Sequence, residues 1–189
     1  MYCKKILWIG FALMVLLQLW APVSMIFNRQ SVLKHGKAYK FRSAPVDPND
    51  PFRGKYIVLR YDAASFKPLP GQRWDYGEKV FVALTEDSAG FARIENAYKE
   101  MPAADSNVVT ANVSYLSSDS LKAVFIEWPF ERFYMEEDKA YKAEQAYNKA
   151  AADSSQRTYA LVKIKNGESV LQNVFINEIP IVDYIKIKK

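Results

Sequence analysis

The chain has 189 residues, half of them hydrophobic and 14% aromatic, which is enough for a packed domain with a short appendage and argues against intrinsic disorder. The net charge is +5, but no dense basic stretch alternates with aromatic residues, so we expect no nucleic-acid partner. A solvated surface or attraction to anionic lipid explains the positive excess equally well. The single cysteine, Cys3, excludes an intramolecular disulfide, and the single histidine, His35, excludes a histidine-rich metal site. We therefore expect no cofactor.

The N-terminal part contains a run of 22 uncharged residues, 6–27, which reads ILWIGFALMVLLQLWAPVSMIF. As a helix it would span roughly 33 Å, enough for a bilayer core of about 30 Å, with Trp8 and Trp20 towards the interfaces. A cleaved signal peptide would have a shorter apolar core and a better cleavage site than WAPVS. We predict an uncleaved signal anchor over residues 1–28, a transmembrane helix in contact with lipid through residues 6–27. Positive charges flank both ends of the run, so the positive-inside rule leaves its orientation open.

Residues 29–189 show short β-rich runs separated by turn residues and are predicted to form one soluble domain. One stretch, 137–152, is rich in the helix formers alanine, lysine and glutamate, with acidic residues in its first turn. Asn166-Gly167 lies between two β-rich runs and predicts a hairpin. The fold class is therefore α+β: a β-rich antiparallel domain of seven or eight strands with one helix, preceded by a single transmembrane helix. The main strand candidates are 37–41, 55–61, 78–86, 91–99, 108–116 and 121–130.

The stretch 45–61, PVDPNDPFRGKYIVLRY, concentrates prolines and charges just before a β-rich run. Its prolines push Asp47 and Asp50 into extended geometry, where each carboxylate can accept backbone N–H groups or meet Arg53. Gly54 permits a backbone conformation or a close approach that a side chain would forbid. The segment lacks the alternating ligands of an EF-hand loop, and an ion site here competes with a structural turn. We favour a rigid clip in which Arg53 pairs with one of the two aspartates and opens the strand.

A second polar segment, FERFYMEE over residues 130–137, mixes aromatic rings, acids and an arginine, Arg132. It is interpreted either as a strand end with solvated or paired charges, or as a polar pocket lined by Tyr134 and Glu131. No glycine-rich phosphate loop, nucleophile elbow, zinc-protease motif or paired-cysteine motif occurs in the chain.

These two segments resemble the GDYXXLXY family of membrane-anchored bacterial envelope proteins. The family pattern P-V-D-P-R-D-x-x-R-G-D-Y-x-x-L-x-Y is matched in one ordered run, and the segment from Glu131 resembles the family's later E-R-aromatic motif. Two departures are Asn49, in place of the usual arginine, and Lys55, in place of the aspartate of the family name. The matching positions of the run are Pro45, Val46, Asp47, Pro48, Asp50, Arg53, Gly54, Tyr56, Leu59 and Tyr61.

The resemblance implies a single-pass protein of the bacterial inner membrane with a periplasmic C-terminal domain. It also implies a gene neighbour that encodes a multi-spanning membrane protein, and it carries no reaction with it. The leading hypothesis is a non-enzymatic accessory or interaction subunit for such a membrane protein. The alternative is an envelope module that binds lipid, glycan or peptide through its aromatic side chains. The candidate interaction residues are Asp47, Asp50, Arg53, Gly54, Tyr56, Leu59, Tyr61, Glu131, Arg132 and Tyr134.

A third hypothesis is an envelope hydrolase that uses Asp47, Asp50 or Glu131. Two carboxylates can divide acid and base roles when their environments separate their pKa values. No motif in the sequence supports such a pair, so we expect a non-enzymatic protein.

Overall fold

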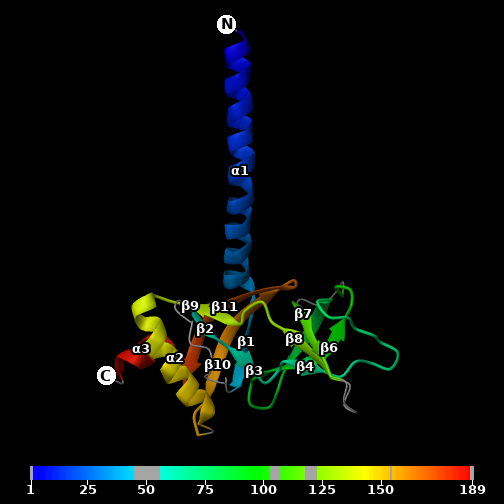
Figure 1. Cartoon of the computed structure of the whole chain (residues 1–189), viewed down its shortest axis with the longest axis vertical. Helices are drawn as coiled ribbons and strands as arrows, with labels where there is room; N and C mark the ends of the chain where they lie inside the picture. The colour runs from blue at the N-terminus through cyan, green and yellow to red at the C-terminus, as the bar shows by residue number, and fades with distance from the viewer. Residues whose placement is uncertain (1, 45–55, 103–106, 118–122, 154, 188–189) are drawn as a thin grey trace.

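The computed structural model describes residues 2–44, 56–102, 107–117, 123–153 and 155–187. It shows one long helix, α1 (Tyr2–His35), standing on a β-rich body that also holds α2 (Glu137–Ala152) and α3 (Ile181–Ile187) (Figure 1). The β-rich antiparallel α+β fold predicted from the sequence is confirmed. The strands are β1 (Lys37–Ala44), β2 (Tyr56–Val58), β3 (Arg60–Tyr61), β4 (Ser65–Phe66), β5 (Lys79–Glu86), β6 (Ala92–Tyr98), β7 (Val108–Leu116), β8 (Val124–Glu127), β9 (Arg132–Tyr134), β10 (Thr158–Lys165), β11 (Glu168–Ile176) and β12 (Ile179–Pro180).

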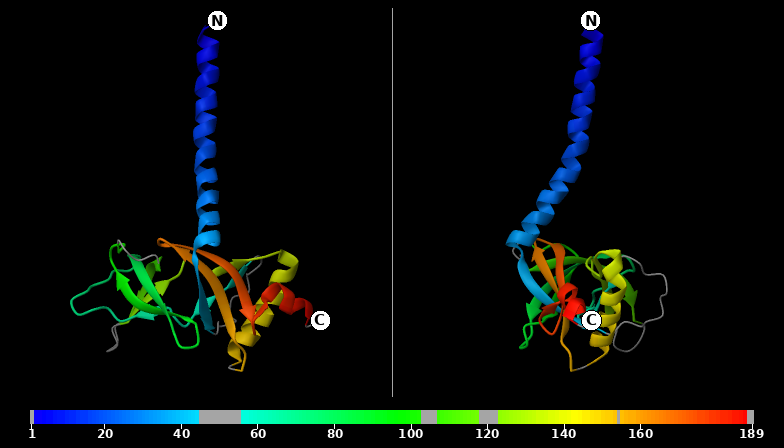
Figure 2. Two further views of the ribbon diagram at one scale, coloured as in Figure 1. Left: turned by 180° about the vertical axis from the view of Figure 1, so that it is seen from behind. Right: turned by 90° about the vertical axis from the view of Figure 1, so that its left-hand side faces the viewer.

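Helix α1 is long and apolar enough to cross a membrane, and it projects away from the body along most of its length. Most of its large apolar side chains from Trp8 to Phe27 are exposed, because the described part of the body covers little of this stretch. The helix changes direction in its domain-proximal half (Figure 2). Pro22 lies inside the helix and removes one backbone donor, which accounts for a bend there.

Two five-stranded sheets form the body, and every pairing between named strands is antiparallel. The first has the order β12-β11-β10-β1-β3 and the second has the order β4-β8-β7-β5-β6, while β2 and β9 form a separate pair. The predicted hairpin at Asn166-Gly167 is confirmed as the β10–β11 turn. Both turn residues have positive φ, 51° and 84°, as a type I′ turn requires.

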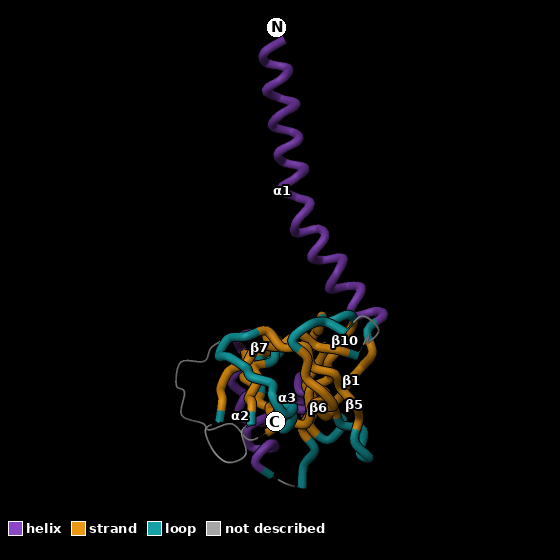
Figure 3. Tube along the Cα trace, turned by 90° about the vertical axis from the view of Figure 1, so that its right-hand side faces the viewer, coloured by secondary structure: helices purple, strands orange, loops and turns teal. Residues whose placement is uncertain are grey.

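One hydrophobic core joins the two sheets with helices α2 and α3. The predicted helix at 137–152 is confirmed as α2, and it buries Ala140, Ala143, Tyr147 and Ala150 at spacings of three and four. Helices α2 and α3 lie on the side of the first sheet away from the second one (Figure 1). Figure 3 shows both helices within the body, whereas α1 projects from it. The core is therefore continuous, and the two sheets belong to one folded unit.

One helix was expected in the domain, but the structure has a second, shorter helix, α3, that was not predicted. Its sequence, IVDYIKI, is rich in β-branched residues and favours a strand. Ile181 and Tyr184 are buried one turn apart, and α3 contacts both α2 and β11. Packing of that face overrides the local preference. In the described part of the chain twelve strands are found where seven or eight were expected, because five of them have only two or three residues.

The last two turns of α1 dock on the β10–β11 hairpin. Val32 is only 3% exposed, the Nζ atom of Lys165 lies 2.8 Å from the Oγ atom of Ser31, and the Asn28 amide donates to Glu168 Oε1 at 3.2 Å. Helix α1 then passes into β1 through Gly36 alone. The boundary expected after residue 28, between the membrane anchor and the domain, thus falls inside a continuous helix. The polar end of this helix is bound to the β10–β11 hairpin.

Candidate functional site

The family-like strand alternates between the core and the outer surface. Ile57, Leu59 and Tyr61 point inward and are 0%, 0% and 3% exposed, whereas Tyr56 is only partly buried. This is the two-residue period of extended backbone. Two of the candidate interaction residues, Leu59 and Tyr61, are therefore core residues.

The two predicted segments lie side by side, since β2 pairs with β9. Tyr56 is opposite Tyr134, and the Leu59 N–H donates to the Glu131 carbonyl at 2.8 Å. On the outer face the rings of Tyr56 and Tyr134 are 5.5 Å apart, and the Arg132 guanidinium lies 5.1 Å from the centre of the Tyr56 ring. Tyr134 is 64% exposed, so it lies on this outer surface.

Tyr61 is fixed in the core by its hydroxyl as well as by its ring. The hydroxyl donates to the Phe130 carbonyl at 2.9 Å, and burial raises the pKa of Tyr61 well above its usual value. The ring packs 5.4 Å from Phe41 and 5.5 Å from Phe130, and Trp128 stacks on Phe130 at 5.4 Å. This aromatic cluster connects β1 and β3 to the segment between β8 and β9.

The Glu131 side chain accepts a hydrogen bond within the turn that contains Trp128. Its Oε1 atom accepts the backbone N–H of Trp128 at 3.0 Å, and the indole Nε1 of Trp128 donates to the Ala63 carbonyl at 2.7 Å. Burial raises the pKa of Glu131, and the hydrogen bond from Trp128 opposes that shift. The carboxylate thus holds the β8–β9 segment in place.

The raised pKa of Glu131 predicts a pH-dependent difference between the wild type and Glu131→Gln. Between its ordinary value of 4.5 and its higher folded value, the folded state binds more protons than the unfolded state, so this residue makes stability fall as pH rises. Glutamine keeps the acceptor for Trp128 and carries no charge. We expect the variant to gain stability relative to the wild type as the pH rises above about 4.5.

Chemical denaturation of the full chain in detergent, followed by tryptophan emission, measures this difference. Carboxylates with lowered pKa values, such as Asp87 and Glu178, change the stability of both proteins alike and cancel in the comparison. A difference that stays constant with pH would contradict the assignment.

The first half of the family-like stretch, with Asp47, Asp50, Arg53 and Gly54, lies outside the described residues, and so does the predicted Arg53 clip. The structure brings Tyr56, Leu59 and Tyr61 together with Glu131, Arg132 and Tyr134 as one paired unit. That unit has two faces, with Tyr134 on the exposed one and Glu131 bonded to the Trp128 backbone. Among the described residues, no group of three or more histidine, cysteine, aspartate or glutamate side chains is placed to hold a metal ion.

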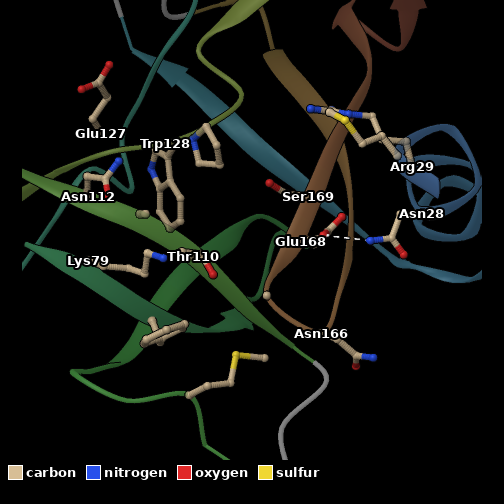
Figure 4. A pocket seen from close by; sticks show the side chains of 16 residues that line it. Asn28, Arg29, Lys79, Thr110, Asn112, Glu127, Trp128, Asn166, Glu168 and Ser169 are labelled. Carbon is tan, nitrogen blue, oxygen red and sulfur yellow. Dashed lines mark hydrogen bonds between the residues drawn. The ribbon is translucent and has the colours of Figure 1, made fainter. Parts of the chain in front are cut away.

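A cavity of about 660 Å³ lies where α1 meets the body, between the β10–β11 turn and the sheet of β5, β7 and β8 (Figure 4). Its lining is mixed, with cations, carboxylates, amides and one indole. The residues that line it are Met25, Asn28, Arg29, Lys79, Phe81, Met101, Thr110, Ala111, Asn112, Glu127, Trp128, Pro129, Asn166, Gly167, Glu168 and Ser169.

The β10–β11 turn is joined to β7 along one side of this cavity. The Thr110 N–H donates to the Gly167 carbonyl at 2.9 Å, and the Gly167 N–H donates to the Val108 carbonyl at 3.1 Å. A Cβ atom on Gly167 would lie 3.1 Å from the Thr110 hydroxyl and 3.2 Å from the Met101 sulfur. Glycine is needed here for both its positive φ and this close approach. The cavity is therefore bounded by fixed backbone.

The opposite wall depends on the family-like residues. Glu127, Trp128 and Pro129 line the cavity, and the next two residues, Phe130 and Glu131, accept backbone or hydroxyl hydrogen bonds from Leu59 and Tyr61. Sequence reasoning missed this cavity, because its walls come from segments far apart in the chain.

The family model of the GDYXXLXY protein matches residues 18–174. This match covers most of the chain, from the second half of α1 to β11, and the chain belongs to the GDYXXLXY family. No curated protein and no solved structure matches the chain.

Proposed function

We propose that this protein is a membrane-anchored envelope protein that serves as a non-enzymatic accessory subunit of a multi-spanning membrane protein. In this proposal α1 crosses the bacterial inner membrane and the domain lies on the periplasmic side. The observation that carries the proposal is the direct passage of α1 into β1, with Val32 buried and only Gly36 between the two elements. Such a junction holds the domain close to the bilayer in one orientation.

The exposed surface of α1 supports a membrane partner. The helix is apolar on all sides from Trp8 to Phe27, and the described part of the body covers little of that stretch, near Met25. A helix of this kind is buried in lipid or against other transmembrane helices. Because its end is docked on the hairpin, a partner that packs on α1 would also fix the position of the domain.

Affinity purification of the full chain in mild detergent tests this proposal. Residues 6–24 are replaced by an unrelated apolar helix of equal length, while the docked end from Met25 onward is kept. We expect a multi-spanning protein to co-purify in stoichiometric amount with the wild type and to be lost with the replaced helix. Failure to recover any such protein with the wild type would overturn the accessory-subunit proposal.

A second candidate function is a binding module for an envelope lipid, glycan or peptide, and the cavity beside α1 favours it. Cavities of about 300–1,000 Å³ are typical of small-molecule sites, and this one combines an indole with several charged and amide groups.

A further inference from the structure

The cavity opens at the level expected for lipid headgroups. Met25 belongs to the 22-residue apolar run, and Asn28 and Arg29 are the first polar residues after it, yet all three line the cavity. Because such a run matches the thickness of the bilayer core, its end lies at the interface between hydrocarbon and water. A cavity lined from that point of α1 faces the polar headgroup layer.

A row of polar side chains crosses three neighbouring strands on the cavity surface. Lys79 of β5 is the register partner of Asn112 of β7, and Asn112 is the register partner of Glu127 of β8. Direct cross-strand partners point to the same face of a sheet. The lysine and the glutamate are two strand spacings apart, about 10 Å at the backbone. An amine and a carboxylate thus flank a central amide.

These two charges are available to a ligand. Within the described ranges, no side-chain hydrogen bond or ion pair joins Lys79 or Glu127 to another residue, and both residues are exposed. Glu127 lies close enough to Glu131 and Arg132 to act on them electrostatically. Figure 4 shows Lys79 extending from β5 towards Thr110, while Arg29 enters the lining from α1. The lining therefore holds two cations, Arg29 and Lys79, and two carboxylates, of which Glu168 already accepts a hydrogen bond from Asn28.

We propose that this cavity binds the headgroup of a phospholipid that carries both a phosphate and a primary amine. Lys79 and Arg29 would bind the phosphate, Glu127 would accept the ammonium group, and Asn112 would hydrogen-bond between them. The acyl chains would run along α1 from Met25 into the bilayer. The inference rests on the membrane placement given under the proposed function, and it does not require the protein partner.

The charge pattern argues for an amine-bearing lipid over a purely anionic one. A headgroup with phosphate alone would satisfy the cations and leave Glu127 facing a negative group, which is unfavourable. A quaternary ammonium would pair with Glu127 by charge but could donate no N–H hydrogen bond. Ethanolamine phospholipid is therefore the preferred occupant.

The test uses the full chain in nanodiscs that hold equal amounts of phosphatidylethanolamine, phosphatidylglycerol and phosphatidylcholine. Native mass spectrometry after release counts the lipids that the protein retains. We expect the wild type to retain phosphatidylethanolamine preferentially. Glu127→Gln should reduce the preference for phosphatidylethanolamine over phosphatidylglycerol about tenfold, since it removes one charge-assisted hydrogen bond. Lys79→Gln should lower the retention of all three lipids, since each of them carries a phosphate.

Lys149→Gln, which lies in a separate groove between α2 and α3, is the matched control and should leave retention unchanged. Equal retention of the three lipids by the wild type, or no effect of either cavity variant, would overturn the proposal. Displacement of the bound phosphatidylethanolamine by an equal concentration of soluble glycerophosphoethanolamine would also overturn the proposal. So would the retention of a peptide by the protein in place of lipid. Recovery of the membrane partner is measured on the same variants, so a failure of lipid binding is distinguished from a failure of the accessory function.

Discussion

Leu59→Ala is expected to lower the free energy of unfolding by about 2–5 kcal/mol, the usual cost of removing a buried leucine side chain. Leu59 is fully buried between β2 and β3, where the chain passes from one pair of strands to the next. The Leu59 N–H also donates a hydrogen bond to the Glu131 carbonyl. Loss of packing at Leu59 therefore weakens the attachment of the segment between β8 and β9, in which Glu131 accepts the Trp128 N–H. Denaturant unfolding of the full chain in detergent measures the change.

Tyr56→Ala is the matched control, because Tyr56 is another residue of the family name and its side chain lies on the outer face of the same extended segment. It loses the contacts with Arg132 and Tyr134, which are partly exposed and worth about 1 kcal/mol. Equal losses in the two variants would contradict the assignment of Leu59 to the core and Tyr56 to the surface.

This contrast separates two roles within the residues that name the family. Leu59 and Tyr61 belong to the core that supports the cavity wall. Tyr56 instead faces outward beside Arg132. Lys55, which stands where the family name has aspartate, lies outside the described residues. The described part of the motif therefore contributes to folding directly and to the cavity through the β8–β9 segment.

Local sequence pattern was sufficient for most of the secondary structure. The β-rich run 108–116 predicted β7, the alanine- and charge-rich composition of 137–152 predicted α2, and Asn166-Gly167 predicted the hairpin. Each of these signals arises from neighbouring residues. Helix α3 escaped prediction because its stability comes from contacts with α2 and β11 rather than from its own composition.

The cavity could not be predicted in the same way, because its charges come from separate elements. Arg29, Lys79 and Glu127 are far apart in sequence and meet only through the docking of α1 and the order of β5, β7 and β8. The inward orientation of Leu59 and Tyr61, in contrast, follows from the two-residue period of the strand. That period separates candidate interaction residues from core residues without knowledge of the fold.

The junction between helix and domain gives the second large expected effect. A Cβ atom at Gly36 would lie 2.4 Å from the Val32 carbonyl oxygen and 2.9 Å from the Ile164 carbonyl oxygen. Both neighbours are backbone atoms, one in the last turn of α1 and one in β10, so neither can move without disturbing its element. The Gly36 N–H also donates to the same Val32 oxygen at 2.8 Å. Gly36 is thus the point at which α1 touches the sheet through backbone alone.

Gly36→Ala is therefore expected to cost about 1–3 kcal/mol of folding stability, the typical penalty for overpacking, and to loosen the docked end of α1. Hydrogen exchange on the full chain in detergent would show faster exchange at the start of β1 and through the last turns of α1, with β7 unchanged. Gly10→Ala is the matched control, since nothing lies within 4 Å of a Cβ atom there and alanine favours the helix. If Gly36→Ala exchanges like the wild type, α1 is not coupled to the domain through this contact. The fixed orientation on which the accessory proposal depends would then be lost.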